Sequence, residues 1–206
     1  SIADKGGNLA IPVFSYSFLG DLNLFDMNKT PCVLEKLSEY LRKKNIFNRT
    51  CDPNFSYLLY GNNFDCRHKK VHDYNTFGDG GLIDDIFKSN GYLCALGGFL
   101  EHLTELHYIE NKLKLSYRSN KIFNGNTIDY KGIKHNQNII YYCRDLDSNY
   151  ISSFVKFKKD IRESGFLKNI FIKGYEMRLE VLKFKDCYDF LKEKISSDPR
   201  YCWGKK

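Results

Sequence analysis

The chain has 206 residues, of which 42% are hydrophobic and 28% are charged; these proportions are typical of globular domains and exclude a mainly disordered chain. Its formal net charge of +7 favours an anionic partner, such as a nucleic acid, a nucleotide or coenzyme phosphates. No apolar run approaches the ~20 residues that a bilayer span needs, so we expect no membrane partner.

The seven cysteines are an odd number, and none of them forms a C-x-x-C motif. This spacing argues against zinc ribbons and thioredoxin-type redox motifs, and we expect no metal. Most of the cysteines lie in apolar stretches, as Cys94 and Cys143 do, where Cys is usually a small core residue. We therefore expect a reduced, cytoplasmic protein.

Strand and helix patterns alternate along the chain. A helix is predicted to begin at Thr30-Pro31, since Thr suits the N-cap and Pro the first helical position. The nearly all-apolar run 92–96 predicts a strand buried on both faces. Further strands are predicted at 8–14, 55–60, 139–143 and 169–173, and helices at 82–88, 104–115, 152–164 and 186–195, while 176–184 is ambiguous. The alternation favours an α/β fold.

The stretch 97–110 is the most informative for chemistry, because it predicts a Gly-Gly turn followed by a helix whose N-cap is Thr104. Thr104, His107 and Glu110 are spaced i, i+3 and i+6, so successive pairs share a helix face. A hydroxyl, an imidazole and a carboxylate in this arrangement make a candidate general-base site. The alternative from periodicity alone is a plain cap, a satisfied half-buried histidine and a solvated charge.

Two other features are weaker. The loop Gly78-Asp79-Gly80-Gly81 opens a helix and is either an anion site or only a turn. His72-Asp73 is either a polar contribution to a cleft or a plain loop pair. Cys66 beside Arg67 raises thiol chemistry as a third function, although a surface turn explains it as well. No zinc finger or RNP motif supports nucleic-acid binding.

Five segments resemble, in order, the motifs of the aminoglycoside 3-N-acetyltransferase family, which is distinct from the GNAT fold. GNLAIPVFSY at 7–16 is similar to the family's GTLVMPTFTY, RTCDP at 49–53 to its R-S-x-H-P, and FGDGGLID at 77–84 to its F-G-x-G-S-P-F-D. GYLCALG at 91–97 with the following T-x-x-H-x-x-E also matches, as do DLD at 145–147 with DPRY at 198–201. Asp52 stands in place of the family's His, and Gly81-Leu82 in place of its Ser-Pro.

The resemblance implies an α/β fold with a central mixed β-sheet flanked by helices. It implies one acyltransferase domain over residues 1–206 that lacks the family's leading N-terminal segment. The expected activity is transfer of an acetyl or other acyl group from acyl-CoA to an amine of an aminoglycoside or a nucleotide-linked amino sugar. The partners are then CoA and a small amine, with a homodimer left open and no nucleic acid. The alternative is a basic binding protein without catalysis.

The resemblance also suggests roles for particular residues. His107 is the candidate general base, and Glu110 or Asp145 orients it. Thr104 touches the thioester region. The resemblance also suggests Phe14, Ser15, Tyr16, Gly78 and Gly80 for the coenzyme. The loop pair His72 and Asp73, which no family motif includes, is the candidate for the amine substrate.

Overall fold

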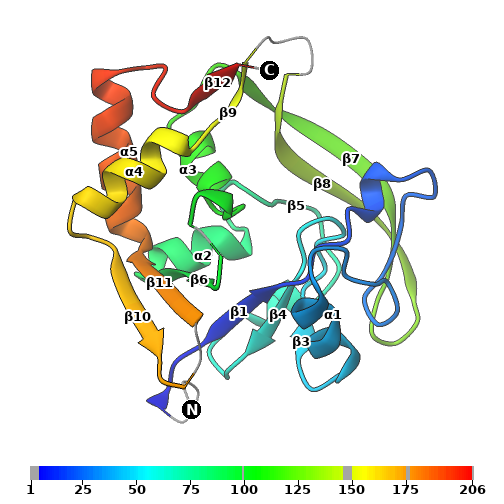
Figure 1. The fold of residues 1–206 in the computed structure, drawn as a ribbon. Helices are drawn as coiled ribbons and strands as arrows, with labels where there is room; N and C mark the ends of the chain where they lie inside the picture. Colours follow the sequence, from blue (N-terminus) through cyan, green and yellow to red (C-terminus); the bar gives the residue numbers. More distant parts are fainter. Residues whose placement is uncertain (1–4, 99, 146–149, 175–176, 206) are drawn as a thin grey trace. The chain divides into compact units, whose positions relative to one another are not determined.

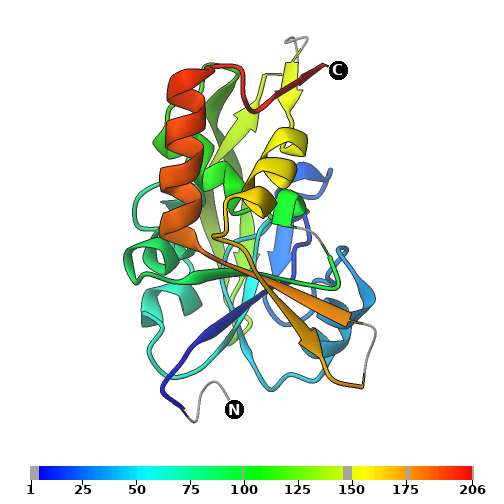
Figure 2. The ribbon, with the colours of Figure 1, turned by 60° about the vertical axis from the view of Figure 1, so that its left-hand side comes forward.

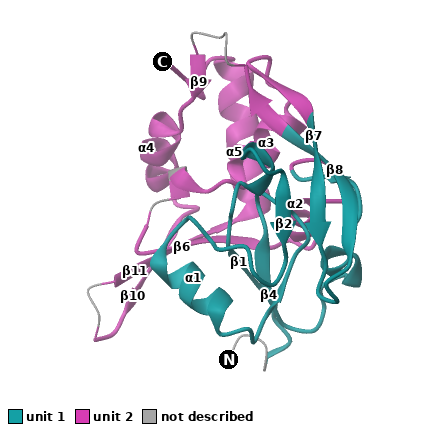
Figure 3. Cartoon of the chain, turned by 90° about the vertical axis from the view of Figure 1, so that its right-hand side faces the viewer, with its two compact units in different colours: residues 1–76, 122–141 teal, residues 77–121, 142–206 magenta. Residues whose placement is uncertain are grey.

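The computed structural model describes residues 5–98, 100–145, 150–174 and 177–205 (Figure 1). The chain divides into two compact units (Figure 3). Unit 1 consists of residues 1–76 and 122–141, and unit 2 consists of residues 77–121 and 142–206. The single acyltransferase domain expected for residues 1–206 stays a prediction.

Unit 1 contains two small sheets. In the first, β4 (Tyr57–Tyr60) pairs antiparallel with β1 (Leu9–Pro12) on one side and β3 (Asn48–Arg49) on the other. In the second, the long strands β7 (Arg118–Ile128) and β8 (Lys134–Arg144) lie side by side, with β2 (Leu24–Asp26) parallel to β7 and β5 (Tyr74–Asn75) parallel to β8. Helix α1 (Lys36–Lys43) and 3₁₀ helices at Ser17–Leu19 and Cys66–Lys69 also belong here; the first residues of β7 and the last of β8 belong to unit 2.

Unit 2 contains the antiparallel sheet β10-β11-β6, formed by β10 (Lys168–Ile172), β11 (Met177–Lys183) and β6 (Tyr92–Leu96). A second antiparallel pair joins β9 (Tyr150–Ser152) to β12 (Trp203–Lys205). The helices are α2 (Leu82–Lys88), α3 (Leu106–Lys112), α4 (Val155–Glu163) and α5 (Phe184–Ser197), with a 3₁₀ helix at Leu100–His102. Strand β11 runs directly into α5 (Figure 2), whose buried Phe184 packs against Phe87 and Tyr108.

Mixed parallel and antiparallel pairing confirms the α/β class, with the strands distributed over several sheets. Strand β6 has the predicted bounds, but its burial on both faces was wrong: Leu93 and Ala95 are buried, whereas Tyr92, Cys94 and Leu96 are exposed. Such alternation is the burial pattern of a strand with one covered face. Cys94 is therefore exposed and Cys143 only half-buried, which corrects the core position expected for both.

Four predicted helix starts were also wrong, and one of them is α4, which begins at Val155 and not at Ser152. Helix α1 begins at Lys36 and not at Thr30-Pro31; the Thr30 hydroxyl instead accepts a hydrogen bond from the Asp26 N–H. Helix α5 begins at Phe184, which places Asp186 in its first turn. Helix α3 begins at Leu106, because the preceding residues form a tighter turn in which the Thr104 carbonyl accepts the His107 N–H.

None of the helices in the described ranges is long and apolar enough to cross a bilayer.

Candidate active site

His107 and Glu110 form a short contact on one face of α3. They are three residues apart, and the His107 Nδ1 lies 2.6 Å from the Glu110 Oε2. The His107 side chain keeps 25% of its surface exposed, whereas Glu110 keeps 1%. A buried carboxylate thus holds an imidazole that reaches solvent, the arrangement needed for a base that acts on an incoming molecule.

Further donors surround the Glu110 carboxylate. Its Oε1 accepts hydrogen bonds from the Tyr117 hydroxyl at 2.5 Å and the Ser152 hydroxyl at 2.8 Å. The Arg118 Nε lies 2.9 Å from Oε2, the oxygen that also contacts His107. A carboxylate offers about four acceptor positions, and these four contacts occupy both oxygens. The carboxylate is therefore fixed in place although it is buried.

Burial on its own raises the pKa of Glu110, because it disfavours the charged carboxylate. The contact with His107 acts in the opposite direction, as do the positive charge of Arg118 and the Tyr117 hydroxyl, and the net pKa lies below its ordinary value. Burial and the Glu110 charge raise the pKa of Tyr117, so its hydroxyl remains a donor. Glu110 is thus a carboxylate at neutral pH.

The His107 ring lies among apolar and cationic neighbours. Phe77 meets it edge-on at 5.8 Å between ring centroids, and Phe154 lies tilted at 6.2 Å. The Arg118 Nη2 lies 3.3 Å from the His107 Nε2. A carboxylate accepts at Nδ1 and a guanidinium donates at Nε2, so these contacts fit a neutral ring that carries its proton on Nδ1.

The glycine loop before α2 is tied to the helices that follow it. The Gly80 N–H donates to the Asp84 Oδ2 at 2.8 Å, and the Phe77 carbonyl accepts a hydrogen bond from Asn111 on α3 at 2.8 Å. Asp84 is buried and also contacts Tyr108 and Lys88. The Gly80 N–H therefore already has an acceptor within the chain. The coenzyme role of Gly78 and Gly80 stays a prediction.

Thr104 and Asp145 lie in the same unit as His107. Thr104 is half-buried, and its carbonyl is bonded to the His107 N–H at 3.0 Å. The Asp145 N–H donates to the Tyr117 carbonyl at 3.2 Å. Of the two acids expected to orient His107, Glu110 makes the direct contact with its ring.

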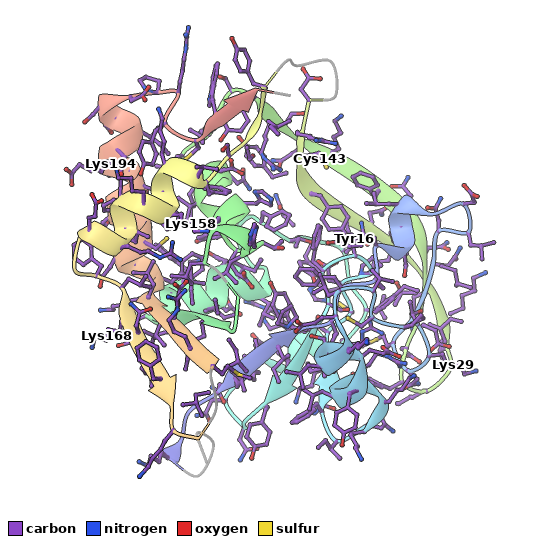
Figure 4. The ribbon with its side chains drawn as sticks, in the orientation of Figure 1. Tyr16, Lys29, Cys143, Lys158, Lys168 and Lys194 are labelled. Carbon is purple, nitrogen blue, oxygen red and sulfur yellow. The ribbon has the colours of Figure 1, made fainter. Side chains whose placement is uncertain are left out.

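The segment 14–16 belongs to unit 1. Phe14 is buried and packs edge-on against Phe55 and Tyr57, and the Ser15 hydroxyl donates to the Pro53 carbonyl at 2.7 Å. Tyr16, labelled in Figure 4, has a positive φ of 52° and is 36% exposed. The role of these three residues in binding a coenzyme stays a prediction.

His72 and Asp73 also belong to unit 1. Asn138 donates to Asp73 through its backbone N–H at 2.7 Å and its side-chain amide at 2.8 Å. The His72 ring stacks on Tyr74, and its Nδ1 lies 2.8 Å from the Lys70 carbonyl. These contacts anchor β5 to β8, and the substrate-binding role of the pair stays a prediction.

Asp52, which stands at the position of the family's His, is buried in unit 1. Its carboxylate accepts hydrogen bonds from the Asn54 and Phe55 N–H groups and from the Tyr141 and Thr76 hydroxyls. Burial raises its pKa, and these hydrogen bonds oppose the rise. Asp52 therefore joins the backbone of Asn54 and Phe55 to the side chains of Thr76 and Tyr141, which is a structural role.

Sequence reasoning did not identify Tyr117, Arg118 and Ser152. Tyr117 and Arg118 lie where β7 begins, and the polar sequence of that strand gave no period-2 pattern. Ser152 lies on β9, at the point where a helix was expected to begin. Only the density of hydrogen-bonding residues at 117–120 could have signalled a network there.

Among the described residues no group of three or more His, Cys, Asp or Glu side chains is arranged to hold a metal ion.

Several solved structures share the fold of this chain. AAC-IIIb in a binary complex with CoASH is 16% identical over 92% of this chain and 78% of that chain, with a TM-score of 0.69. Sisomicin-bound AAC-VIa is 13% identical over 93% and 79%, with a TM-score of 0.71. The YokD protein from Bacillus subtilis is 12% identical over 94% and 76%, with a TM-score of 0.66. At these identities the likeness concerns the fold, and it confirms the expected fold class.

No curated protein matches the sequence. The family model described as aminoglycoside 3-N-acetyltransferase, in contrast, matches residues 5–196, which include all the motif segments up to α5. The chain therefore belongs to the aminoglycoside 3-N-acetyltransferase family, as the resemblance predicted, and is an N-acyltransferase by class.

Proposed function

We propose that this chain transfers an acetyl group from acetyl-CoA to an amine of an amino sugar, with His107 as the general base. The observation that carries the proposal is the 2.6 Å contact between His107 and the buried carboxylate of Glu110. An amine must lose a proton as it forms an amide, and a partly exposed imidazole held by a carboxylate suits that task near neutral pH.

Each residue of the site has a defined part in the transfer. Nε2 of His107 takes the proton of the attacking amine, and the Glu110 carboxylate stabilises the resulting imidazolium through Nδ1–H. Acetyl-CoA supplies an acyl carbon activated as a thioester, and the carbon–sulfur bond breaks as the carbon–nitrogen bond forms. The rings of Phe77 and Phe154 beside His107 fit this chemistry, because apolar walls suit an acetyl group and restrict water.

The acceptor is an amino sugar, either an aminoglycoside or a nucleotide-linked amino sugar. Family membership favours an aminoglycoside, and AAC-VIa was solved with sisomicin bound. The net charge of +7 favours the nucleotide-linked class, since its phosphates are anionic and aminoglycosides are cationic. Incubation with acetyl-CoA and both classes of acceptor, followed by CoA thiol release and the product mass, distinguishes them.

His107→Gln tests the role of the base. The substitution keeps hydrogen-bonding capacity but removes basicity near pH 7, so kcat is expected to fall by about 10²–10⁴-fold. The KM for acetyl-CoA is expected to change little, because the base acts on the amine. Steady-state kinetics of thiol release measures both constants.

The matched control is His135→Gln, which alters another histidine paired with a carboxylate, Asp129, at 2.9 Å in unit 1. It should leave kcat unchanged. A folded His107→Gln variant with normal turnover would end the general-base proposal. No thiol release with any amine, together with salt-sensitive oligonucleotide binding, would favour the alternative of a binding protein.

A further inference from the structure

Arg118 contacts three residues of the candidate active site, Ser152, Glu110 and His107, although the proposed transfer gives it no role. Its side chain is 10% exposed at the start of β7. Its Nε lies 2.9 Å from both Ser152 Oγ and Glu110 Oε2, its Nη1 donates to the Tyr142 carbonyl at 2.8 Å, and its Nη2 lies 3.3 Å from the His107 Nε2. One guanidinium thus reaches both members of the His107–Glu110 pair.

The chemistry of these contacts restricts the state of the imidazole. A guanidinium has only donors and stays protonated, so its N–H at Nε2 requires a lone pair on that nitrogen. The Glu110 carboxylate has only acceptors, so its contact at Nδ1 requires a proton there. Together the two partners select the single neutral form in which Nε2 is the basic nitrogen.

We propose that Arg118 is a positioning residue that keeps the His107 Nε2 unprotonated and ready for the substrate amine, while fixing the Glu110 oxygen that holds Nδ1. The inference rests on the proposed function, because it assumes that His107 is the base. It adds a residue outside the T-x-x-H-x-x-E motif that determines which nitrogen acts.

The charges around His107 set the direction of the effect. The groups that face the ring are Glu110 on α3, Arg118 on β7 and the uncharged rings of Phe77 and Phe154; Tyr117 contacts Glu110 from its other oxygen. Glu110 favours a positively charged ring, and Arg118 disfavours one. When the amine binds, its N–H replaces that of Arg118 at the single lone pair of Nε2. Once Nε2 has taken the proton, the nearby Arg118 charge favours release of that proton before the next turnover.

The test compares Arg118→Met and Arg118→Lys in the 206-residue chain. Methionine removes the positive charge and the contacts with His107 and Glu110. A protonated His107 ring is then less disfavoured, so the acidic limb of the plot of kcat/KM against pH should move to higher pH by about 1 unit, as expected when a like charge within ~4–6 Å is lost. Lysine keeps the positive charge but lacks the several donors of the planar guanidinium group. The acidic limb of the Arg118→Lys pH profile should therefore stay near the wild-type position, while kcat falls because His107 and Glu110 are held less well in place.

The matched control is Arg162→Met. Arg162 contacts the buried carboxylate of Glu180 in the same unit, with its Nη2 2.9 Å from Oε1. This variant loses an arginine–glutamate contact of the same kind away from His107, so it should lose stability without moving the limb. An acidic limb that moves equally in both methionine variants, or in neither, would overturn the proposal.

Nitrogen NMR of the His107 ring provides a readout that does not depend on activity. The wild-type chain at pH 8 should show a protonated Nδ1 and an unprotonated Nε2, and Arg118→Met should show a mixture of the two neutral forms. A wild-type ring protonated on Nε2 overturns the inference about Arg118 even if acetyl transfer is observed. Conversely, the predicted ring state without acetyl transfer supports the Arg118 role and counts only against the proposed function.

Discussion

At the scale of single residues, two buried ionic groups, Glu110 and Arg49, are held in different ways. The charge of Glu110 in unit 2 is balanced by Arg118, and its carboxylate also contacts His107. Arg49 in unit 1 donates instead to the carbonyls of Val13 and Thr30 and to the Ser56 hydroxyl. Burial, followed by the charge of Arg42, lowers the pKa of Arg49 to about 10, which leaves it charged at neutral pH. Arg49 therefore ties backbone segments together, whereas Glu110 is set to act on a histidine.

Glu110→Gln tests that difference through the pH dependence of folding. The pKa of Glu110 is lower in the folded chain than its unfolded value of about 4.3, so its contribution to stability is complete above that value and is lost as pH falls through the folded pKa. The variant should unfold more easily at pH 7 by about 3 kcal/mol, because His107 and Arg118 lose a buried charged partner.

The difference between the variant and the wild type should shrink as pH falls below about 4, where wild-type Glu110 also becomes neutral. Urea unfolding across this pH range measures it. Exposed Glu163 provides the control, and Glu163→Gln should follow the wild-type curve. A constant difference at all pH values would contradict the charged role given to Glu110.

At the scale of elements, strongly periodic or well-bounded segments were predicted correctly from sequence. The helix at 82–88 and the strand at 92–96 have the predicted bounds, since Gly loops flank the first and apolar residues fill the second. The helix expected from Thr30 begins only at Lys36, and Val33 and Leu34, which precede it, are exposed and have no core contact to extend the helix to them. Strand β7 was not predicted, because its sequence is mostly polar and shows no alternation of apolar residues. It is a strand because its backbone pairs with β8, and backbone pairing does not require apolar side chains.

Gly61 tests how tightly β1 and β4 approach each other at their ends. It has a φ of +118°, and an added Cβ would lie 2.2 Å from the Asn8 Oδ1 and 2.9 Å from the Gly7 carbonyl oxygen. Gly61→Ala should therefore lower the free energy of unfolding by about 2 kcal/mol or more, through backbone strain and overpacking. Chemical denaturation measures the change.

Gly132 is the matched control in the same unit. Its φ is +80°, but an added Cβ would have no atom within 4 Å. Gly132→Ala should cost only the strain of the left-handed backbone, about 1 kcal/mol. Equal losses in the two variants would show that the close approach at Gly61 contributes nothing.

At the scale of the whole molecule, the candidate residues are distributed over both compact units. The His107 network lies within unit 2, and segment 14–16 with the pair His72 and Asp73 lies within unit 1. The ordered motifs pointed to His107, Glu110 and segment 14–16 from sequence, whereas His72 and Asp73 were proposed only from their place before the glycine loop. The motifs did not reveal the fixation of Glu110 by Tyr117 and Ser152, since partners from β7 and β9 are brought to α3 only by folding.

Coenzyme binding by the whole chain gives the last prediction. A ligand that binds only the folded state stabilises it by about 2.7 kcal/mol at about 100 times its Kd. For a chain of this size that corresponds to a rise in Tm of roughly 5–10 °C. Thermal unfolding with increasing CoA measures the rise, and His107→Gln should show the same rise as the wild type because the base acts on the amine. A Tm that stays constant up to millimolar CoA would count against the coenzyme. A rise lost in His107→Gln alone would instead make His107 a coenzyme contact, because a residue that acts only on the amine adds nothing to CoA binding.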